Sequence, residues 1–196
     1  KGYTKQELIS AGLAVNGKNG RLYDKFRNRL MLPVIDVRGD VVGFGSRVLD
    51  KSEPKYMNTP ETLTYSKRRI LYGMNLAKKS KRSNIILCEG NLDVVTLHQA
   101  GFDNAVASMG TALTQEQLRL LSRYTKELVL CYDNDNAGQQ ATRRALELLN
   151  NSEFSVKVLQ LPRRLVDGEY IKQDADDFIK FQGPAAFERL LTGSEN

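Results

Sequence analysis

Residues 83–165 alternate between short apolar runs and longer segments with apolar residues at helical spacing. The apolar runs are four to six residues long and rich in Val, Ile and Leu, as in strands buried on both faces of a parallel sheet. Strands that alternate with helices predict βαβ units and therefore an α/β fold. The expected strands are residues 84–88, 104–107, 128–132 and 155–160, and the expected helices are residues 91–100, 114–121 and 136–149.

The first 82 residues have a different pattern, in which short runs of alternating polarity are separated by polar turns. Thr4 and Glu7 have the spacing of a helix-capping box, just before apolar residues at helical spacing. Gly43 and Gly45, inside an expected strand, indicate a bulge or the close approach of another group. Residues 50–69 contain two prolines and predict irregular structure. The regular elements expected in this half are a helix over residues 5–11, a turn over 16–20, a hairpin formed by 30–37 and 41–49, and a short helix over 75–79.

A basic, polar segment over residues 78–82 separates the two patterns, and we place a domain boundary at its end. We therefore expect a basic N-terminal subdomain over residues 1–82 and an α/β domain over residues 83–165. Residues 166–196 follow as an acidic segment, with a helical pattern over residues 184–191.

The composition is that of an ordinary globular protein, with 41% hydrophobic and 27% charged residues. No apolar run approaches the roughly 18 residues that a membrane span needs, and no signal peptide is visible. Cys88 and Cys131 lie in or beside apolar strands, which favours small core residues over a disulfide or a metal pair. We therefore expect a cytoplasmic protein with reduced thiols and no membrane partner.

The charge is unevenly distributed along the chain, whose formal net charge is +6. Residues 1–82 hold 18 Lys and Arg against 7 Asp and Glu, whereas residues 83–196 hold 11 against 16. A basic half joined to an acidic half suggests a polyanion partner that binds beside a cation site. Two solvated surfaces of opposite charge would have the same composition, so the motifs must decide between these interpretations.

Acidic residues follow two of the expected strands at their carboxyl ends. Glu89 comes directly after the strand over residues 84–88, and Asp133 and Asp135 follow the strand over residues 128–132. Ligands of open α/β sheets bind at the carboxyl ends of the strands, and residues i and i+2 of an extended segment point to the same side. Such oxygens suit Mg²⁺ or Mn²⁺, which bind together with phosphate groups. A DxD pair alone is also typical of turns and helix caps.

A second DxD pair, Asp174 and Asp176, repeats this spacing and could complete a second cation position. Two metal ions about 4 Å apart stabilise the attacking and leaving oxygens of a phosphoryl displacement. Residues 108–111 fit either a phosphate-binding loop or a turn before the helix cap at Thr114. His98 is the only histidine and is expected at a helix surface, so zinc is not indicated.

With these motifs established, the sequence resembles the DnaG-type primases of bacteria over nearly its whole length. The segments of the acidic half that are similar to the Toprim domain of that family are Glu89-Gly90-Asn91-Leu92-Asp93-Val94, residues 105–114, and Tyr132-Asp133-Asn134-Asp135-Asn136-Ala137-Gly138. The segments of the basic half that are similar to the family's basic subdomain, in the same order, are residues 27–33, 42–49, 54–61 and 71–73.

The resemblance implies a fragment of the primase RNA polymerase core. Residues 1–82 would be part of its basic subdomain, residues 83–165 its Toprim domain, and residues 166–196 the acidic segment and the start of a helical subdomain. The implied reaction is template-directed synthesis of short RNA primers on single-stranded DNA, by attack of a ribonucleotide 3′-oxygen on the α-phosphate of an NTP. The family's zinc-binding domain would precede this chain, and its helicase-binding domain would follow it.

The resemblance also implies roles for individual residues. The acids that match the family's catalytic set are Glu89, Asp133 and Asp135. The implied metal ligands are Glu89, Asp93, Asp133, Asp135, Asp174 and Asp176, with Asp93 in a supporting role. The basic residues that would contact NTP and template phosphates are Arg27, Arg29, Arg47, Lys55 and Lys67. Asn91, Asn134 and Ala175 stand where the family usually has an aromatic residue, glycine and proline, so the turn geometry at Asn134 is open.

The implied partners are a single-stranded DNA template, NTPs, the RNA–DNA hybrid product and, through a domain outside this chain, the replicative helicase. The implied location is the bacterial cytoplasm, at the nucleoid during replication. A Toprim nuclease or topoisomerase-like enzyme would share the Glu and DxD acids, but the basic half argues against it. A non-catalytic nucleic-acid-binding module is the third alternative. The carboxylates argue against it, because a pure binder gains little from acids beside phosphates.

Overall fold

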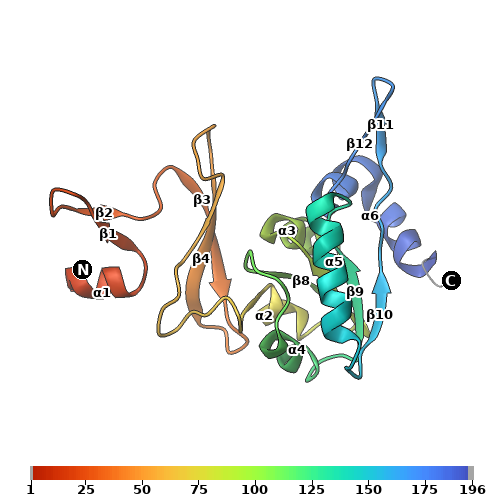
Figure 1. Cartoon of the computed structure of the whole chain (residues 1–196), viewed down its shortest axis with the longest axis horizontal. Helices are drawn as coiled ribbons and strands as arrows, with labels where there is room; N and C mark the ends of the chain where they lie inside the picture. Colours follow the sequence, from red (N-terminus) through yellow and green to blue (C-terminus); the bar gives the residue numbers. More distant parts are fainter. Residues whose placement is uncertain (1, 194–196) are drawn as a thin grey trace.

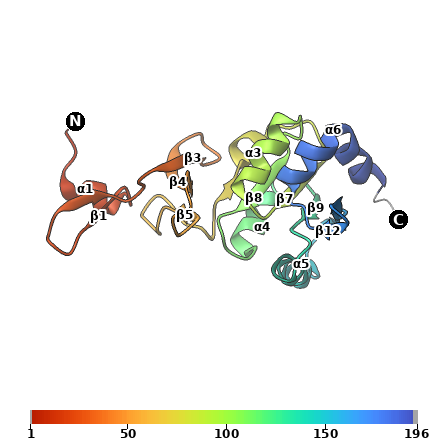
Figure 2. The ribbon, with the colours of Figure 1, turned by 90° about the horizontal axis from the view of Figure 1, so that it is seen from above.

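A computed structural model of the protein describes residues 2–193. The molecule is elongated, with its N-terminal elements at one end and a larger α/β unit at the other (Figure 1). From the N-terminal end, a small hairpin comes first, a three-stranded antiparallel sheet follows, and a five-stranded sheet with its helices forms the rest (Figures 1 and 2).

Within residues 2–193, the largest sheet has five strands, four of them parallel, and this confirms the predicted α/β fold. The strands are β6 Leu71–Tyr72, β7 Asn84–Cys88, β8 Ala105–Ser108, β9 Glu127–Cys131 and β10 Ser155–Val158. They lie in the order β10-β9-β7-β8-β6, with β6 as the antiparallel edge strand. The sequence did not predict β6, because two residues carry no periodic signal.

Helices cover both faces of this sheet, which is why its central strands are apolar throughout (Figure 2). The helices are α2 Met74–Ala77, α3 Asn91–Gln99, α4 Gln115–Leu121, α5 Asn136–Leu149 and α6 Ala175–Gly193. α3 and α6 pack on one face around the buried rings of Phe178 and Phe187. α2, α4 and α5 cover the other face, mainly through Leu and Ala side chains.

The C-terminal helix is longer than the sequence predicts. The pattern predicts a helix over residues 184–191, but α6 already begins at Ala175. There the Asp174 carboxylate accepts the Asp177 N–H at 2.7 Å and so caps the first turn. Gly183, at φ 79° and ψ 168°, interrupts the helix just before Pro184. The acidic segment is therefore the start of a helix, where negative charge is stabilising.

A hairpin between β10 and α6 was not predicted. It consists of β11 Arg164–Val166 and β12 Glu169–Ile171, which pair antiparallel. Asp167 and Gly168 form its turn with φ values of 50° and 85°. Asp-Gly is a strong signal for such a two-residue turn, so the hairpin could have been found from the sequence.

In the N-terminal half, the capping box at Thr4 and Glu7 and the predicted long hairpin are both confirmed. The elements are α1 Lys5–Ser10, β1 Ala14–Asn16, β2 Leu22–Asp24, β3 Arg29–Ile35, β4 Val41–Val48 and β5 Tyr56–Asn58. β1 pairs with β2, and β5 adds a third strand to the β3–β4 hairpin. These three-residue strands were not predicted, since they are too short to show an alternating pattern.

The three-stranded sheet lies directly against the α/β unit. A Cβ at Gly45 would lie 2.5 Å from the side-chain nitrogen of Asn91, and a Cβ at Gly43 would lie 3.0 Å from a tyrosine ring. The Asn58 side-chain amide donates to the Met109 carbonyl oxygen at 3.2 Å. The predicted close approach is therefore confirmed at both glycines. The neighbours of Gly43 belong to the basic half itself, whereas the contact of Gly45 with Asn91 and the Asn58 hydrogen bond bring the basic half to the carboxyl edge of the large sheet.

Cys88 and Cys131 are buried and free, as predicted for core residues. His98 differs from the prediction of a surface residue, because its ring hydrogen-bonds to the Ala105 carbonyl oxygen at 2.8 Å and is partly buried. Of the helices in the part of the chain that the structure describes, none is both long enough and apolar enough to span a bilayer.

Candidate active site

Two neighbouring strands bring Glu89 and Asp133 together. β7 and β9 run parallel with Cys88 opposite Cys131, so the residues that follow them meet at the carboxyl edge of the sheet. The Asp133 N–H donates to Glu89 Oε2 at 3.4 Å. β7 has β8 on one side and β9 on the other, so this edge is a topological switch point, where α/β sheets bind ligands.

Asp93 lies at the same edge, in the first turn of α3, and only 7% of it is exposed. Its carboxylate accepts the Gly90 N–H at 3.0 Å and the Asp176 N–H at 3.2 Å. The side chain thereby joins the loop after β7 to the first turn of α6. Asp93 therefore positions the two segments that carry the other acids.

The first turn of α6 and the residue before it add the carboxylates of Asp176, Asp177 and Asp174, whose nearest oxygens all lie within 4.8 Å of one another. The Thr96 hydroxyl and the Lys180 ammonium donate to Asp176. Asp177 was not among the ligands that the resemblance implies. Its position three residues after Asp174 could have pointed to it, since residues i and i+3 share one face of a helix.

Burial and the charges of neighbouring acids raise the pKa values of Asp93, Asp133 and Asp174. Burial and then the charge of Asp174 raise the pKa of Asp93 to about 7. Burial and then the charge of Glu89 raise the pKa of Asp133 to about 6, and burial also raises the pKa of Asp174. A divalent cation among these oxygens would remove the repulsion, so the donor set fits a hard ion such as Mg²⁺ or Mn²⁺.

Asp135 has surroundings different from those of Asp133. Its carboxylate caps α5 by accepting the Gly138 N–H at 2.8 Å, and this hydrogen bond lowers its pKa. The Lys172 ammonium lies 3.8 Å from its other oxygen. Among the described residues, the other acids line a common cavity, and Asp135 does not line it. Within the first DxD pair, Asp133 thus lines the cavity, whereas Asp135 holds the start of a helix.

The turn from Asp133 into α5 is tight, and glycine is required at one position. A Cβ at Gly138 would lie 2.0 Å from the Asp133 carbonyl oxygen. Asn134 stands where the family usually has glycine, but within residues 2–193 only Asn28 and Asp167 are non-glycine residues with positive φ. Asn134 therefore has an ordinary backbone conformation, and the turn does not need glycine there.

A cavity of about 550 Å³ brings the acids together with basic residues of the N-terminal half. Its acidic lining residues are Glu89, Asp93, Asp133, Asp174, Asp176 and Asp177, and its basic ones are Arg47, Lys55 and Lys180. The Arg47 guanidinium and the Lys55 ammonium lie 5.9 and 5.5 Å from the centre of the Tyr56 ring. Burial and the charges of the nearby acids raise the pKa of Tyr56, which also lines the cavity.

The other three predicted basic residues lie outside the described lining of this cavity. The Arg27 guanidinium lies 5.9 Å from the centre of the Tyr23 ring, near the N-terminal hairpin. Arg29 donates to the Pro54 carbonyl oxygen at 2.7 Å and so holds the loop before β5. The backbone N–H of Lys67 donates to the Glu61 carboxylate at 2.8 Å. The structure thus brings only Arg47 and Lys55 of the predicted basic set to the acids.

Comparison with known proteins covers both halves of the chain. A family model described as "DNA primase catalytic core, N-terminal domain" matches residues 1–78, and one described as "Toprim-like" matches residues 86–179. The DNA primase of Clostridium acetobutylicum is 48% identical over 192 residues, which cover 97% of this chain and 31% of that primase. The chain therefore spans about a third of the length of the curated relatives it matches.

Solved primase structures have the same fold. The catalytic core of the Escherichia coli primase is 41% identical, with a TM-score of 0.84, and the match covers 96% of this chain and 59% of that one. The DnaG primase catalytic domain bound to single-stranded DNA is 39% identical, with a TM-score of 0.85, over 98% of this chain and 61% of that one. These matches confirm the resemblance read from the motifs. The chain belongs to the DnaG-type DNA primases of bacteria, and it holds part of their catalytic core with a Toprim domain.

Proposed function

We propose that this chain carries the catalytic centre of a DNA primase, which synthesises short RNA primers on single-stranded DNA from NTPs. The observation that carries the proposal is the single cavity in which the carboxylates at the switch point meet Arg47 and Lys55. Cations that bind phosphate oxygens and carboxylates that hold metal ions are the two parts that phosphoryl transfer requires.

In this proposal, the ligands of Mg²⁺ or Mn²⁺ are Glu89, Asp133, Asp174, Asp176 and Asp177, with Asp93 as the residue that positions them. When bound, such ions neutralise charge on the triphosphate and lower the pKa of the attacking hydroxyl. Asp135, which the resemblance includes among the catalytic acids, would act through Asp133, because its charge contributes to the raised pKa of that residue.

The reaction would join a ribonucleotide 3′-oxygen to the α-phosphorus of the incoming NTP, while the bond from that phosphorus to pyrophosphate breaks. Arg47 and Lys55 would hold the triphosphate or the template beside the carboxylates. Arg27, Arg29 and Lys67 would contact the nucleic acid at other points of the basic half. A related catalytic domain has been solved with single-stranded DNA, which supports such a strand as the template.

We also propose a division of the chain by role. Residues 1–82 would be the basic subdomain that binds nucleic acid, although its last elements, β6 and α2, pack with the large sheet. Residues 83–165 would be the Toprim domain that holds the carboxylates after β7 and β9. Residues 166–196 would add the acids of α6 and begin a helical subdomain. The RNA–DNA hybrid would form along the basic half, and a replicative helicase would bind through a further domain, at the bacterial nucleoid.

The experiment is template-dependent incorporation of labelled ribonucleotides on single-stranded DNA with Mg²⁺. A ribonuclease-sensitive product made by the wild type, and lost in Asp133→Ala, would support the proposal. Asp24→Ala is the matched control, because Asp24 is an exposed acid of β2 away from the cavity. Cleavage of DNA without NTPs would favour a Toprim nuclease or topoisomerase instead. DNA binding with neither reaction would favour a non-catalytic module.

A further inference from the structure

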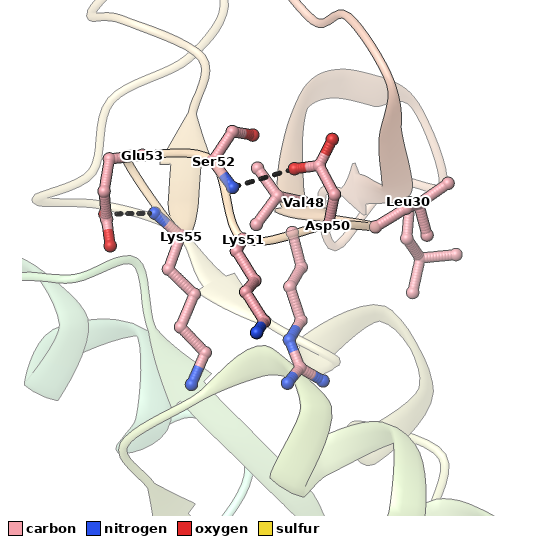
Figure 3. Close-up of a pocket in the computed structure, with 9 residues that line it drawn as sticks. Leu30, Val48, Asp50, Lys51, Ser52, Glu53 and Lys55 are labelled. Atoms are coloured by element: carbon pink, nitrogen blue, oxygen red, sulfur yellow. Dashed lines mark hydrogen bonds between the residues drawn. The ribbon is translucent and has the colours of Figure 1, made fainter.

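A second cavity of about 570 Å³ adjoins the acid-lined one, at the end of β4 and the loop that leads to β5. Arg47 and Lys55 line both cavities, so these two cations connect them. Lys51 lines the second cavity, and Figure 3 shows its side chain extending to the same side of the loop as that of Lys55. Three cationic side chains therefore border one space.

The two acids of the second cavity are already hydrogen-bonded to backbone groups of its loop. Asp50 accepts the Ser52 N–H at 2.8 Å, and Glu53 accepts the Lys55 N–H at 2.9 Å (Figure 3). These bonds shape the loop that presents the cations. Among the ion pairs of residues 2–193, none involves any of the three cationic side chains. The cavity therefore has positive charge available to an anionic ligand.

The second cavity also has an apolar wall. Leu30 and Leu49 line it and are 45% and 67% exposed, and Val48 lies beside them. A ligand that satisfies this lining must have an anionic group and an apolar face. Nucleotides have both, because each phosphate is joined to a sugar and a base that pack against apolar side chains.

We propose that Lys51, together with Arg47 and Lys55, binds a phosphate group next to the one that reacts at the carboxylates. This inference rests on the proposed function and adds a subsite to it. Lys51 did not stand out in the sequence because Asp50 and Glu53 lie on either side of it, so the segment does not look basic. The phosphate belongs either to the backbone of a nucleic-acid strand or to the triphosphate of a nucleotide.

The test measures two ligands separately on the full chain with Mg²⁺ present. A fluorescent oligodeoxythymidylate reports strand binding by anisotropy between 50 and 200 mM KCl, and ATP binding is measured by calorimetry. The variants are Lys51→Ala and Lys51→Arg, with Lys18→Ala as the control. Lys18 is an exposed lysine of the β1–β2 loop and lines neither cavity. Thermal unfolding of each variant checks that the fold is intact.

If the phosphate belongs to a strand, Lys51→Ala reduces the magnitude of the slope of log K against log[KCl] by about 0.7. The ratio of wild-type to variant affinity then falls about 2.6-fold between 50 and 200 mM KCl. For a triphosphate, Lys51→Ala weakens ATP binding by up to about fivefold instead. In either case Lys51→Arg retains binding and Lys18→Ala leaves both values unchanged. Wild-type values for Lys51→Ala with both ligands would overturn the subsite. A wild-type chain that binds neither ligand would overturn the proposed function itself.

Discussion

The raised pKa of Asp93 predicts that the metal-free protein loses stability as the pH rises. In the unfolded chain an aspartate has a pKa of about 3.9, whereas the pKa of Asp93 in the folded protein is about 7. The folded state therefore binds more protons than the unfolded state between these values. The contribution of Asp93 to the free energy of unfolding is therefore fully present below about pH 4, and it is lost as the pH rises through about 7.

The size of the effect follows from the two pKa values. For Asp93 alone, linkage gives a loss of about 2.5 kcal/mol in the free energy of unfolding between pH 5 and pH 8. For a chain of this size, that corresponds to a decrease in Tm of roughly 5 to 10 °C. The raised pKa values of Asp133 and Asp174 act in the same direction.

The assay is urea unfolding at pH 5, 6, 7 and 8, in EDTA and in 10 mM Mg²⁺. Mg²⁺ should restore stability mainly at pH 7 and 8, because there the ion binds a set of ionised carboxylates. Asp93→Asn should flatten the pH dependence in EDTA. At pH 5 the folded protein holds Asp93 as a neutral carboxylic acid, so the neutral amide should lower stability there by only about 0.5 to 1.5 kcal/mol, the contribution of the one backbone N–H that its nitrogen cannot accept.

Asp24→Asn, which changes an exposed acid of β2, should keep the pH dependence of the wild type. The reasoning is wrong if the metal-free protein is as stable at pH 8 as at pH 5. It is also wrong if Asp93→Asn retains the slope of the wild type, because the titrating group would then lie elsewhere.

Three further predictions follow from the site. Asp133→Ala should reduce ribonucleotide incorporation at least about 100-fold while changing the Kd for single-stranded DNA less than twofold; wild-type synthesis would remove Asp133 from the mechanism. Lys55→Ala should raise the apparent KM for NTP or template, and unchanged kinetics would reassign Lys55 to the solvated surface. Gly138→Ala should lower stability by about 1 to 3 kcal/mol in thermal unfolding, because its Cβ would lie 2.0 Å from the Asp133 carbonyl oxygen; an unchanged Tm would show that the turn can shift.

Local patterns in the sequence were enough to predict the elements that hold the first acids. A continuous apolar run of strand length predicts a buried strand, and the residue after it must lie at the edge of the sheet. Glu89 and Asp133 were placed in this way, and the structure has them within hydrogen-bonding distance. The capping box at Thr4 and the helix cap at Thr114 were equally visible, because each depends on residues only three positions apart.

Elements without a periodic signal were missed. β5 and β6 are three and two residues long, and they become strands only because a neighbouring strand offers unpaired backbone groups. The first turn of α6 was also missed, because Gly183 and Pro184 interrupt the pattern and hide the helix that precedes them. In both cases the conformation depends on groups that are distant in the sequence or on a break within the element.

Residues with the same local sequence pattern have different roles, and only the tertiary structure distinguishes them. Asp133 and Asp135 have the same local pattern, yet Asp135 caps α5 and Asp133 lines the cavity. Among the basic residues, packing of the three-stranded sheet against α3 brings Arg47 and Lys55 to the acids and leaves Arg27 near the N-terminal hairpin.

The sequence by itself therefore determined the parallel sheet, the acids at its edge and the family, since each can be recognised from patterns of residues that are close together in the chain. Only the tertiary structure decided which acids share a cavity, which cations reach it, and that Lys51 borders a second one. The physical reason is that charge and metal binding act over a few ångströms of space, and the chain brings those residues together only when the separate elements pack.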